Sequence, residues 1–311
     1  MHILLIVNPR AGRCRGQAAA DRAVAAFREL GWQVTMRPTQ CAGDAERIAR
    51  EAVGEGFDAV LGCGGDGTLS QVLTGLLDSG VPGGAVPAGT GNDLCRCVGL
   101  SVDPAEAARQ LVGGGPAPVD LLEVDGGRRW AINIAGVGFD ARVAARVNRR
   151  SRRTGGLLAY LTAVGAELVR HRPTRVRITV DGEEWEGPAL LVAAANGRSY
   201  GAGMMIAPEA RVDDGLMDVV LVRHMSRARF VASFPHVMRG THLALPEVTA
   251  WRARALTVET PAPQPLLVDG DLQGETPTTI RVAPGRALMW VPGNTSAHRS
   301  GRQPDTQEVD R

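Results

Sequence analysis

The chain has 311 residues, 44% of them hydrophobic, and a formal net charge of +2. This length predicts one large or two ordinary domains, and the near-balanced charge gives no support to a nucleic-acid-binding role. The five cysteines form no CxxC pair, which favours a reducing compartment over a disulfide framework. The N-terminus lacks a signal-peptide cleavage site and no apolar run reaches the length of a membrane span, so we expect a soluble cytoplasmic protein.

The first candidate binding turn follows a buried strand. Residues 3–7 form a continuous aliphatic run, typical of a parallel strand covered on both faces. The run ends in five small, polar or basic residues, Asn8-Pro9-Arg10-Ala11-Gly12. Asn8 and Gly12 can present polar groups to a nucleotide, and nearby arginines can meet phosphate. A ligand-free Asn-Pro turn explains the same residues equally well.

Strands and helices then alternate. A helix is predicted over residues 18–30, a strand over 33–37, a helix starting near 44 and a third strand over 57–61. This alternation predicts a parallel sheet with right-handed crossovers. Thr39 follows the second strand, at the carboxyl end where ligands collect in such sheets.

A glycine-rich turn joins the third strand to a helix. It reads Gly62-Cys63-Gly64-Gly65-Asp66-Gly67-Thr68-Leu69-Ser70-Gln71. Such a turn lets backbone N–H groups approach an anion, and Thr68 and Ser70 add hydroxyl donors. The carboxylate of Asp66 would repel phosphate unless a cation lies between them or it acts on the acceptor. The turn therefore indicates Mg²⁺-nucleotide chemistry, with a tight turn without ligand as the alternative.

A fourth strand end completes the edge. Residues 85–87 are a short strand followed by a second glycine turn, in which Thr90 and Asn92 offer hydrogen bonds and Asp93 can cap a helix. Four strand ends on one edge predict a nucleotide cleft. The GxGxxG string of a dinucleotide fold does not follow the first strand, which counts against a dehydrogenase.

Six blocks together resemble one family. They are Asn8-Pro9-x-x-Gly12, Gly64-Gly65-Asp66-Gly67-Thr68, Pro87-x-Gly89-Thr90-x-Asn92-Asp93, Asn133-x-x-Gly136-x-Gly138-Phe139-Asp140, Asp214-Gly215-Leu216-Met217-Asp218 and Val268-Asp269-Gly270-Asp271. This set resembles the diacylglycerol kinase catalytic-domain family, which also holds sphingosine and ceramide kinases and soluble bacterial relatives. The resemblance covers about residues 1–292. The Gly-Gly-Asp-Gly-Thr string alone is shared with NAD kinases and does not separate the two.

The resemblance implies the cofactors ATP and Mg²⁺ and a set of binding residues. The implied nucleotide contacts are Asn8, Pro9, Arg10, Ala11, Gly12, Thr39, Gly65, Asp66, Gly67, Thr68, Leu69, Ser70, Gln71 and Thr90. It further implies a structural Mg²⁺ held by the side chain of Asp214 and the backbone carbonyls of Arg211 and Leu216. From the residues alone, the Asp213-Asp214-Gly215 loop is equally well an Asp-Gly turn.

The second half has a different texture. A helix over residues 104–112 is followed by Gly113-Gly114-Gly115-Pro116, after which strands dominate, as at 130–139, 175–180 and 190–195. We expect an α/β nucleotide-binding domain with a parallel sheet at 1–122, a β-rich sandwich domain at 123–292, and a disordered polar tail at 293–311. The last strand is predicted over 285–291.

Asp271 is the expected base. Phosphoryl transfer needs a group that takes the proton of the acceptor hydroxyl, together with cation-assisted charge stabilisation. By resemblance this place holds glutamate, and here it holds Asp271, one methylene shorter, while Asp66 would act through Mg²⁺. The expected function is an ATP-dependent lipid kinase. An NAD kinase-like enzyme with a soluble acceptor, or a nucleotide-binding regulatory protein without turnover, are the alternatives.

A basic segment of the second half is a candidate for contact with a membrane surface. Six arginines lie between Arg142 and Arg153, ahead of an apolar helix expected over residues 155–171. Such a run can rest on an anionic membrane surface, so peripheral contact with the inner face of the membrane is one interpretation. A solvated arginine face beside a core helix is the other. The expected partner is a lipid acceptor, and a homodimer stays open.

Overall fold

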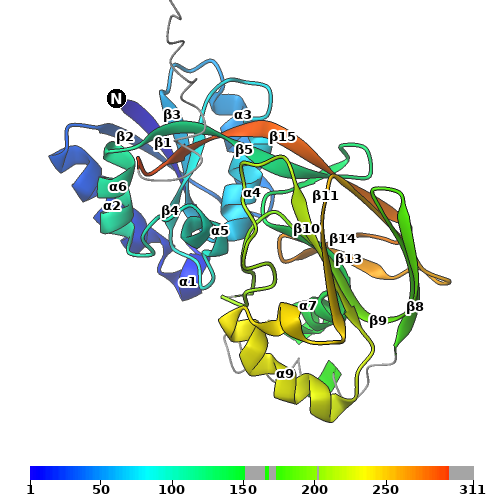
Figure 1. The fold of residues 1–311 in the computed structure, drawn as a ribbon. Coiled ribbons are helices and arrows are strands. Elements are labelled where there is room, and N and C mark those ends of the chain that lie inside the picture. The colour runs from blue at the N-terminus through cyan, green and yellow to red at the C-terminus, as the bar shows by residue number, and fades with distance from the viewer. Residues whose placement is uncertain (151–164, 168–172, 202, 294–311) are drawn as a thin grey trace, which may run out of the picture.

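The computed structural model describes residues 1–150, 165–167, 173–201 and 203–293. It has two parts that lie side by side (Figure 1). The elements of the first part are β1 His2–Val7, α1 Ala11–Cys14, α2 Gly16–Glu29, β2 Gln33–Pro38, α3 Asp44–Ala52, β3 Ala59–Gly64, α4 Asp66–Gly75, β4 Gly83–Pro87, α5 Asp93–Cys97 and α6 Pro104–Val112.

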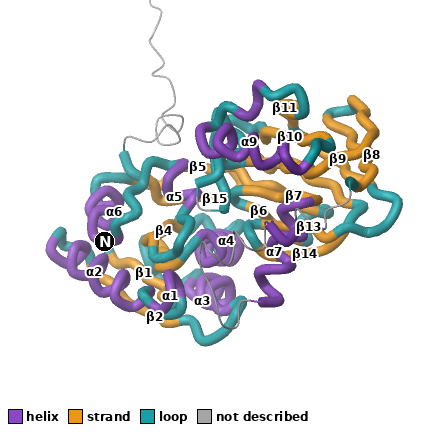
Figure 2. Tube along the Cα trace, turned by 90° about the horizontal axis from the view of Figure 1, so that it is seen from below, coloured by secondary structure: helices purple, strands orange, loops and turns teal. Residues whose placement is uncertain are grey.

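The first part is a parallel sheet between two pairs of helices. Its strands run in the order β2-β1-β3-β4, all parallel. Along β1, Ile3 and Leu5 face the core cluster under α2 and α6, whereas Leu4 and Ile6 face the cluster under α3 and α4. The continuous aliphatic run is therefore explained by burial on both faces, as the sequence predicts. Figure 2 shows the same layers from below, with α4 on the side of the second part.

The second part is mostly antiparallel. Its elements are β5 Gly115–Val124, β6 Arg129–Ala131, β7 Ile134–Gly138, α7 Phe139–Arg150, β8 Thr174–Val180, β9 Glu183–Ala195, β10 Met217–Arg223, α9 Arg227–Arg239, the 3₁₀ turn η1 His242–Ala244, β11 Val248–Ala253, β12 Ala255–Glu259, β13 Pro265–Val268, β14 Asp271–Glu275 and β15 Thr278–Val291. Its main path is β14-β13-β7-β9-β8-β12-β15, and β10 adds to β9.

Two cores lie on the two faces of this part. Along β9, Val192 and Ala194 face a core enclosed by the strands, whereas Leu191 and Ala193 face a second core covered by α7 and α9. The expected α/β domain followed by a β-sandwich is confirmed.

Strands β5 and β15 join the two parts. They pair antiparallel along most of their lengths, and Met289 of β15 also reaches Gly83 of β4. Ala287, Met289 and Val291 enter the first part's core. The proposed division at residue 122 stays a prediction, and to it the structure adds that the last strand returns to the first domain.

Two strand predictions need correction. The strand expected over 130–139 is split into β6 and β7 at Ile132 and Asn133, and Phe139 starts a helix. The last strand starts at Thr278 rather than at residue 285, with a shift in pairing between Ala283 and Ala287. The helix expected over 155–171 lies almost entirely outside the described residues, and so does the tail beyond residue 293.

The two described arginines at the start of the basic run bond within the protein. Arg142 donates to Thr174 and Gln264, each at 2.6 Å, and Arg146 pairs with Glu167 at 2.9 Å. The side chains of the rest of the run lie outside what the structure describes. Among the described residues, no helix has the length and apolarity of a membrane span.

Candidate active site

The carboxyl ends of β1, β2, β3 and β4 lie at one edge of the sheet. Gly12 has φ 54°, and a Cβ there would sit 2.2 Å from the carbonyl oxygen of Ala88. A Cβ on Gly89 would sit 2.5 Å from Cα of Gly65. The turns after β1, β3 and β4 are thus packed backbone against backbone, which only glycine permits at these positions. They form a floor of main-chain groups at the N-terminus of α4, a favourable place for an anion.

Polar groups tie these turns together. The Asn8 amide donates to the Thr68 hydroxyl at 3.3 Å, and its oxygen accepts from the Arg10 N–H at 3.1 Å. The Thr39 N–H donates to the Val7 carbonyl at 2.8 Å, which fixes the start of its turn beside β1. The structure therefore brings the predicted nucleotide residues of the first three turns to one edge.

Asp66 is held in a defined orientation. It is the first residue of α4, and its Oδ1 accepts from the Leu94 N–H at 3.0 Å. Burial raises the pKa of this carboxyl, and hydrogen bonds from the backbone of Leu94 and Asp93 oppose the rise. These hydrogen bonds hold the carboxylate of Asp66, in the turn after β3, against the turn after β4.

Two residues of the implied nucleotide set have other partners in this structure. The side chain of Leu69 is 1% exposed in the core, and its N–H bonds the Gly65 carbonyl at 3.2 Å. The Ser70 hydroxyl donates to Oδ2 of Asp269 at 3.0 Å. Thr90, in contrast, is exposed on the fourth turn. Of the two hydroxyls expected to bind the nucleotide, that of Thr68 accepts a hydrogen bond from Asn8 and that of Ser70 donates one to Asp269.

Asp93 differs from its expected role as a helix cap. Asn92 is the N-cap of α5 and makes no side-chain cap bond to that helix. The carboxylate of Asp93 instead accepts from the Ser199 hydroxyl at 2.8 Å, across the two parts of the molecule. A contact over this sequence distance has no local signal.

Asp271 begins β14, after a tight turn. Asp269 and Gly270 have φ values of 47° and 93°, and Val268 pairs with Asp271 across the hairpin. Asp271 reaches solvent, yet the protein around it raises the pKa of its carboxyl by desolvation. A raised pKa makes a carboxylate a stronger proton acceptor.

The neighbouring Asp269 was missed by sequence reasoning. Its carboxylate accepts from the backbone N–H groups of Ile132, Asn133 and Ile134, at 2.8, 2.9 and 3.0 Å. These bonds occupy the place where β6 would have continued into β7, which explains the split strand. The Val-Asp-Gly-Asp block was visible in the sequence, but the partners of this aspartate, more than a hundred residues away, were not.

The loop before β10 gathers several carboxylates. Asp214 accepts from the Leu216 N–H at 3.1 Å and pairs with Arg252. Asp120 accepts from the Gly215 N–H at 2.7 Å. Burial raises the pKa of Asp218 to about 6, with Asp214 adding to the rise. Among the described residues no group of three or more His, Cys, Asp or Glu side chains is arranged to hold a metal ion.

These donors fit the implied Mg²⁺ set in kind. One carboxylate and two backbone carbonyls leave room for the several waters that Mg²⁺ retains, so a cage of carboxylates is not required. Asp214 is the carboxylate of that set, and its pairing with Arg252 must loosen for a cation to bind it. Besides burial, the charge of Asp214 raises the pKa values of Asp120 and Asp218, so these carboxylates repel one another, and a bound cation would relieve that repulsion.

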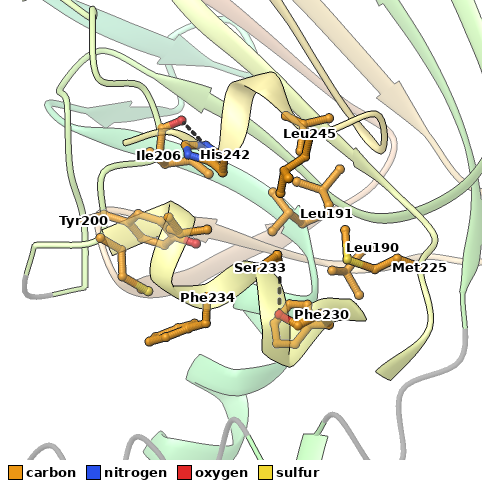
Figure 3. A pocket seen from close by; sticks show the side chains of 14 residues that line it. Leu190, Leu191, Tyr200, Ile206, Met225, Phe230, Ser233, Phe234, His242 and Leu245 are labelled. Carbon is orange, nitrogen blue, oxygen red and sulfur yellow. Dashed lines mark hydrogen bonds between the residues drawn. The ribbon is translucent and has the colours of Figure 1, made fainter. Parts of the chain in front are cut away.

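An apolar pocket lies between the outer face of β9–β10 and α9. Figure 3 shows its lining, which includes Leu191, Ile206, Met225, Phe230 and Phe234. Two polar groups at its wall have partners, because the Ser233 hydroxyl donates to the Phe230 carbonyl at 2.7 Å and Nε2 of His242 lies 3.0 Å from the Ile206 carbonyl. Nδ1 of His242 is buried without a hydrogen-bond partner among the described residues. Burial lowers the pKa of His242, so the imidazole favours its neutral form.

The pocket connects to the Asp271 hairpin through one strand. Leu191 at its base pairs with Gly138 of β7, and Val137 of β7 pairs with Leu266 of β13, which leads into Asp271. Asp271 lies on β14, three strand spacings or about 14 Å from β9. The ring of Phe139, at the end of β7, lies 5.0 Å from the ring of Phe230 in α9. The pocket and the candidate base are therefore built on the same sheet.

Comparison with known proteins supplies the family. A model of the diacylglycerol kinase catalytic domain matches residues 2–124, and a model of the YegS C-terminal NAD kinase beta sandwich-like domain matches residues 133–290. A Mycobacterium tuberculosis (strain ATCC 25618 / H37Rv) protein named diacylglycerol kinase is 36% identical over 295 residues, covering 93% of this chain and 95% of that protein. The chain belongs to the diacylglycerol kinase catalytic-domain family.

Further relatives of this family agree. A Xanthomonas oryzae pv. oryzae (strain MAFF 311018) protein named "Probable lipid kinase YegS-like" is 34% identical over 303 residues, covering 94% of this chain and 97% of that protein. The crystal structure of a diacylglycerol kinase from Bacillus anthracis str. Sterne has a TM-score of 0.71 at 22% identity, covering 94% of this chain and 98% of that one. At this identity the structural likeness shows the fold. The family resemblance drawn from the sequence blocks is confirmed.

Proposed function

We propose that this protein is an ATP-dependent lipid kinase that phosphorylates a lipid hydroxyl. The observation that carries the proposal is a hydrogen bond between the two domains, from Ser70 to Asp269, which lies close in sequence to both candidate carboxylates. Ser70 lies one helical turn after Asp66 in α4, and it contacts Asp269, two residues before Asp271. The phosphate-binding turn and the candidate base are therefore held at one interface.

The chemistry follows from this arrangement. The four sheet-edge turns bind the nucleotide, with the α4 N-terminus at its phosphates. Asp271 accepts the proton of the lipid hydroxyl while the oxygen of that hydroxyl forms a bond to the γ-phosphorus. The bond between that phosphorus and the β–γ bridging oxygen then breaks, and ADP leaves. When bound, Mg²⁺ supplies charge neutralisation at the phosphates, and Asp66 is the carboxylate placed to hold it there.

The apolar pocket favours a lipid over a dinucleotide acceptor. Its lining is predominantly apolar, and the Ser233 hydroxyl and Nε2 of His242 already have partners, so it offers few groups to the sugars and phosphates of NAD. The cavity of about 70 Å³ is half the size of a cavity that binds benzene. An acyl chain thus requires α9 to move outward from β9–β10, and we propose diacylglycerol or a sphingoid lipid as the acceptor class.

A comparison of acceptors tests the proposal. The purified protein is incubated with Mg²⁺ and γ-labelled ATP, and offered diacylglycerol or a sphingoid base in mixed micelles, or NAD in buffer. We expect label in the chloroform-soluble lipid and none in NADP. Label in NADP alone would establish the NAD kinase-like alternative, and ATP binding without label in any acceptor would establish the regulatory one.

A further inference from the structure

The carboxylate of Asp269 is saturated with hydrogen bonds. Oδ2 accepts from the Ser70 hydroxyl at 3.0 Å and the Ile132 N–H at 2.8 Å, and Oδ1 accepts from the N–H groups of Asn133 and Ile134. Its own N–H donates to the Ile134 carbonyl at 2.9 Å. Four of these five bonds lie within the second domain, and the bond to Ser70 crosses to α4. This aspartate therefore fixes the β13–β14 turn and docks it on the phosphate-binding helix.

A second route of bonds returns from this turn to the same helix. The Asn133 amide donates to the Ser199 carbonyl at 2.8 Å, and the Ser199 hydroxyl donates to Asp93 at 2.8 Å. The next residue after Asp93, Leu94, donates its N–H to Asp66 at 3.0 Å. This series of hydrogen bonds starts at Ser70 and ends at Asp66, one turn earlier in α4. Both of its ends therefore lie on the helix beside which we propose phosphoryl transfer.

Burial disfavours the ionised form of the Asp269 carboxyl. Burial raises the pKa of Asp269 to about 6, although four donors oppose the rise. A neutral side chain would avoid this desolvation, but it would lack one of the acceptors that hold Ser70 and the three amides.

We propose that Asp269 is a positioning residue, which sets the distance between Asp271 and the phosphate-binding turn through its bond to Ser70. The proposal rests on the proposed phosphoryl transfer. It differs from the expectation that Ser70 contacts the nucleotide, because a hydroxyl engaged with Asp269 acts on the placement of the base. Loss of the bond leaves both domains folded and lets the Asp271 turn move away from α4.

Ser70→Ala removes the hydrogen bond from Ser70 to Asp269 and leaves the one from Ser199 to Asp93, and Ser79→Ala is its matched control. Ser79 lies just beyond the other end of α4, where its hydroxyl donates to the Leu76 carbonyl at 2.7 Å. Misplacement by about 1 Å can cost roughly 100-fold in rate, so we expect Ser70→Ala to lower kcat by at least about tenfold. The KM for ATP should stay within about threefold, since the Ser70 hydroxyl is engaged with Asp269 in this structure. Ser79→Ala should retain the wild-type kcat.

Rescue and exchange measurements separate the possible outcomes. Ser70→Thr restores the hydroxyl and should recover most of the lost kcat. A wild-type kcat in Ser70→Ala, or a rise in the KM for ATP with kcat unchanged, overturns the proposal, and the second result makes Ser70 a nucleotide contact. Amide exchange over residues 269–275, measured without substrates, should be faster in Ser70→Ala than in Ser79→Ala, and equal exchange also overturns it. Exchange keeps this test independent if wild-type protein phosphorylates no lipid, which would sink the proposed function instead.

Discussion

Oδ1 of Asp66 accepts a hydrogen bond of 3.0 Å from the backbone N–H of Leu94. This contact joins the first residue of α4 to the turn after β4, so the carboxylate is fixed before any ligand binds. This orientation is the basis on which we propose that Asp66 organises charge at the phosphates. A preorganised carboxylate of this kind has its effect on the rate of transfer more than on the fold.

Asp66→Asn tests that assignment. Asparagine keeps the oxygen that accepts from Leu94 and removes the charge, so we expect an unchanged thermal melt and a fall in kcat of about 10²–10³-fold. Turnover is measured at saturating ATP beside Asp21→Asn, an exposed residue on α2 that should behave as wild type. Activity of Asp66→Asn within about threefold of wild type, against that expected loss, would remove Asp66 from the mechanism.

The loop at Asp214 predicts a response to Mg²⁺. A cation that binds only the folded chain stabilises it by mass action. Thermal melts with Mg²⁺ and with EDTA should therefore differ for wild type, and differ less for Asp214→Ala. Asp213→Asn, outside the implied ligand set, serves as the control. If Asp214→Ala and wild type lose the same stability on chelation, this loop holds no important metal.

Asp140 predicts a dependence of stability on pH. Its Oδ2 is buried without a hydrogen-bond partner among the described residues, and burial raises the pKa of the carboxyl to about 6. Between its ordinary pKa near 4 and about 6, the folded chain binds more protons than the unfolded chain. The free energy of unfolding contributed by this group therefore increases as pH falls through 6 and is lost as pH rises.

Asp140→Asn removes this contribution. Because a rise of about two pKa units corresponds to about 3 kcal/mol, we expect the free energy of unfolding at pH 7.5 to increase by up to that amount. Denaturant unfolding at pH 5 and 7.5 measures it, and the difference between the two pH values should be smaller in the variant. Asp218 and Asp269 have raised pKa values too, so some dependence should remain. A variant with the wild-type dependence contradicts the assignment.

The pocket predicts a selective effect on the lipid. Ser233→Phe places a ring in the space between α9 and the sheet, whereas Val231→Phe places the same ring on the outer face of the same helix, where Val231 is 60% exposed. We expect Ser233→Phe to raise the KM for the lipid about tenfold or more, equivalent to about 1.4 kcal/mol of lost binding, with the KM for ATP unchanged. Equal lipid KM values in the two variants would argue against acyl binding there.

The sequence predicted the first domain well because its signals are local. The aliphatic run of β1 and the glycine turn before α4 are each read from neighbouring residues, and both are found in the structure. The split between β6 and β7 was not predictable in this way. Trp130 to Phe139 reads as one strand with a glycine-rich end, and the carboxylate that interrupts it belongs to Asp269, 135 positions from Ile134.

The candidate site shows the same division. Asp66 was singled out because a carboxylate in a glycine turn is chemically conspicuous, and Asp271 through the family resemblance, and their roles stay predictions. The partners that hold them were not identified: Leu94 acts through its backbone, and the direction of the Ser70 hydroxyl depends on a residue from the other domain. The pocket was also invisible, because α9 combines apolar and charged residues without a pattern that indicates a ligand.

The proton-accepting role of Asp271 is tested most directly by transfer of label from γ-labelled ATP into chloroform-soluble lipid. Wild type, Asp271→Asn and Asp271→Glu are compared at saturating ATP and lipid. Since a missing base commonly costs about 10²–10⁴-fold, we expect Asp271→Asn to lose nearly all label transfer while its ATP affinity is unchanged. Label transfer by Asp271→Glu should also be lower than in wild type, because the longer side chain would extend past the position that the aspartate carboxylate occupies. Full label transfer by Asp271→Asn would contradict the account.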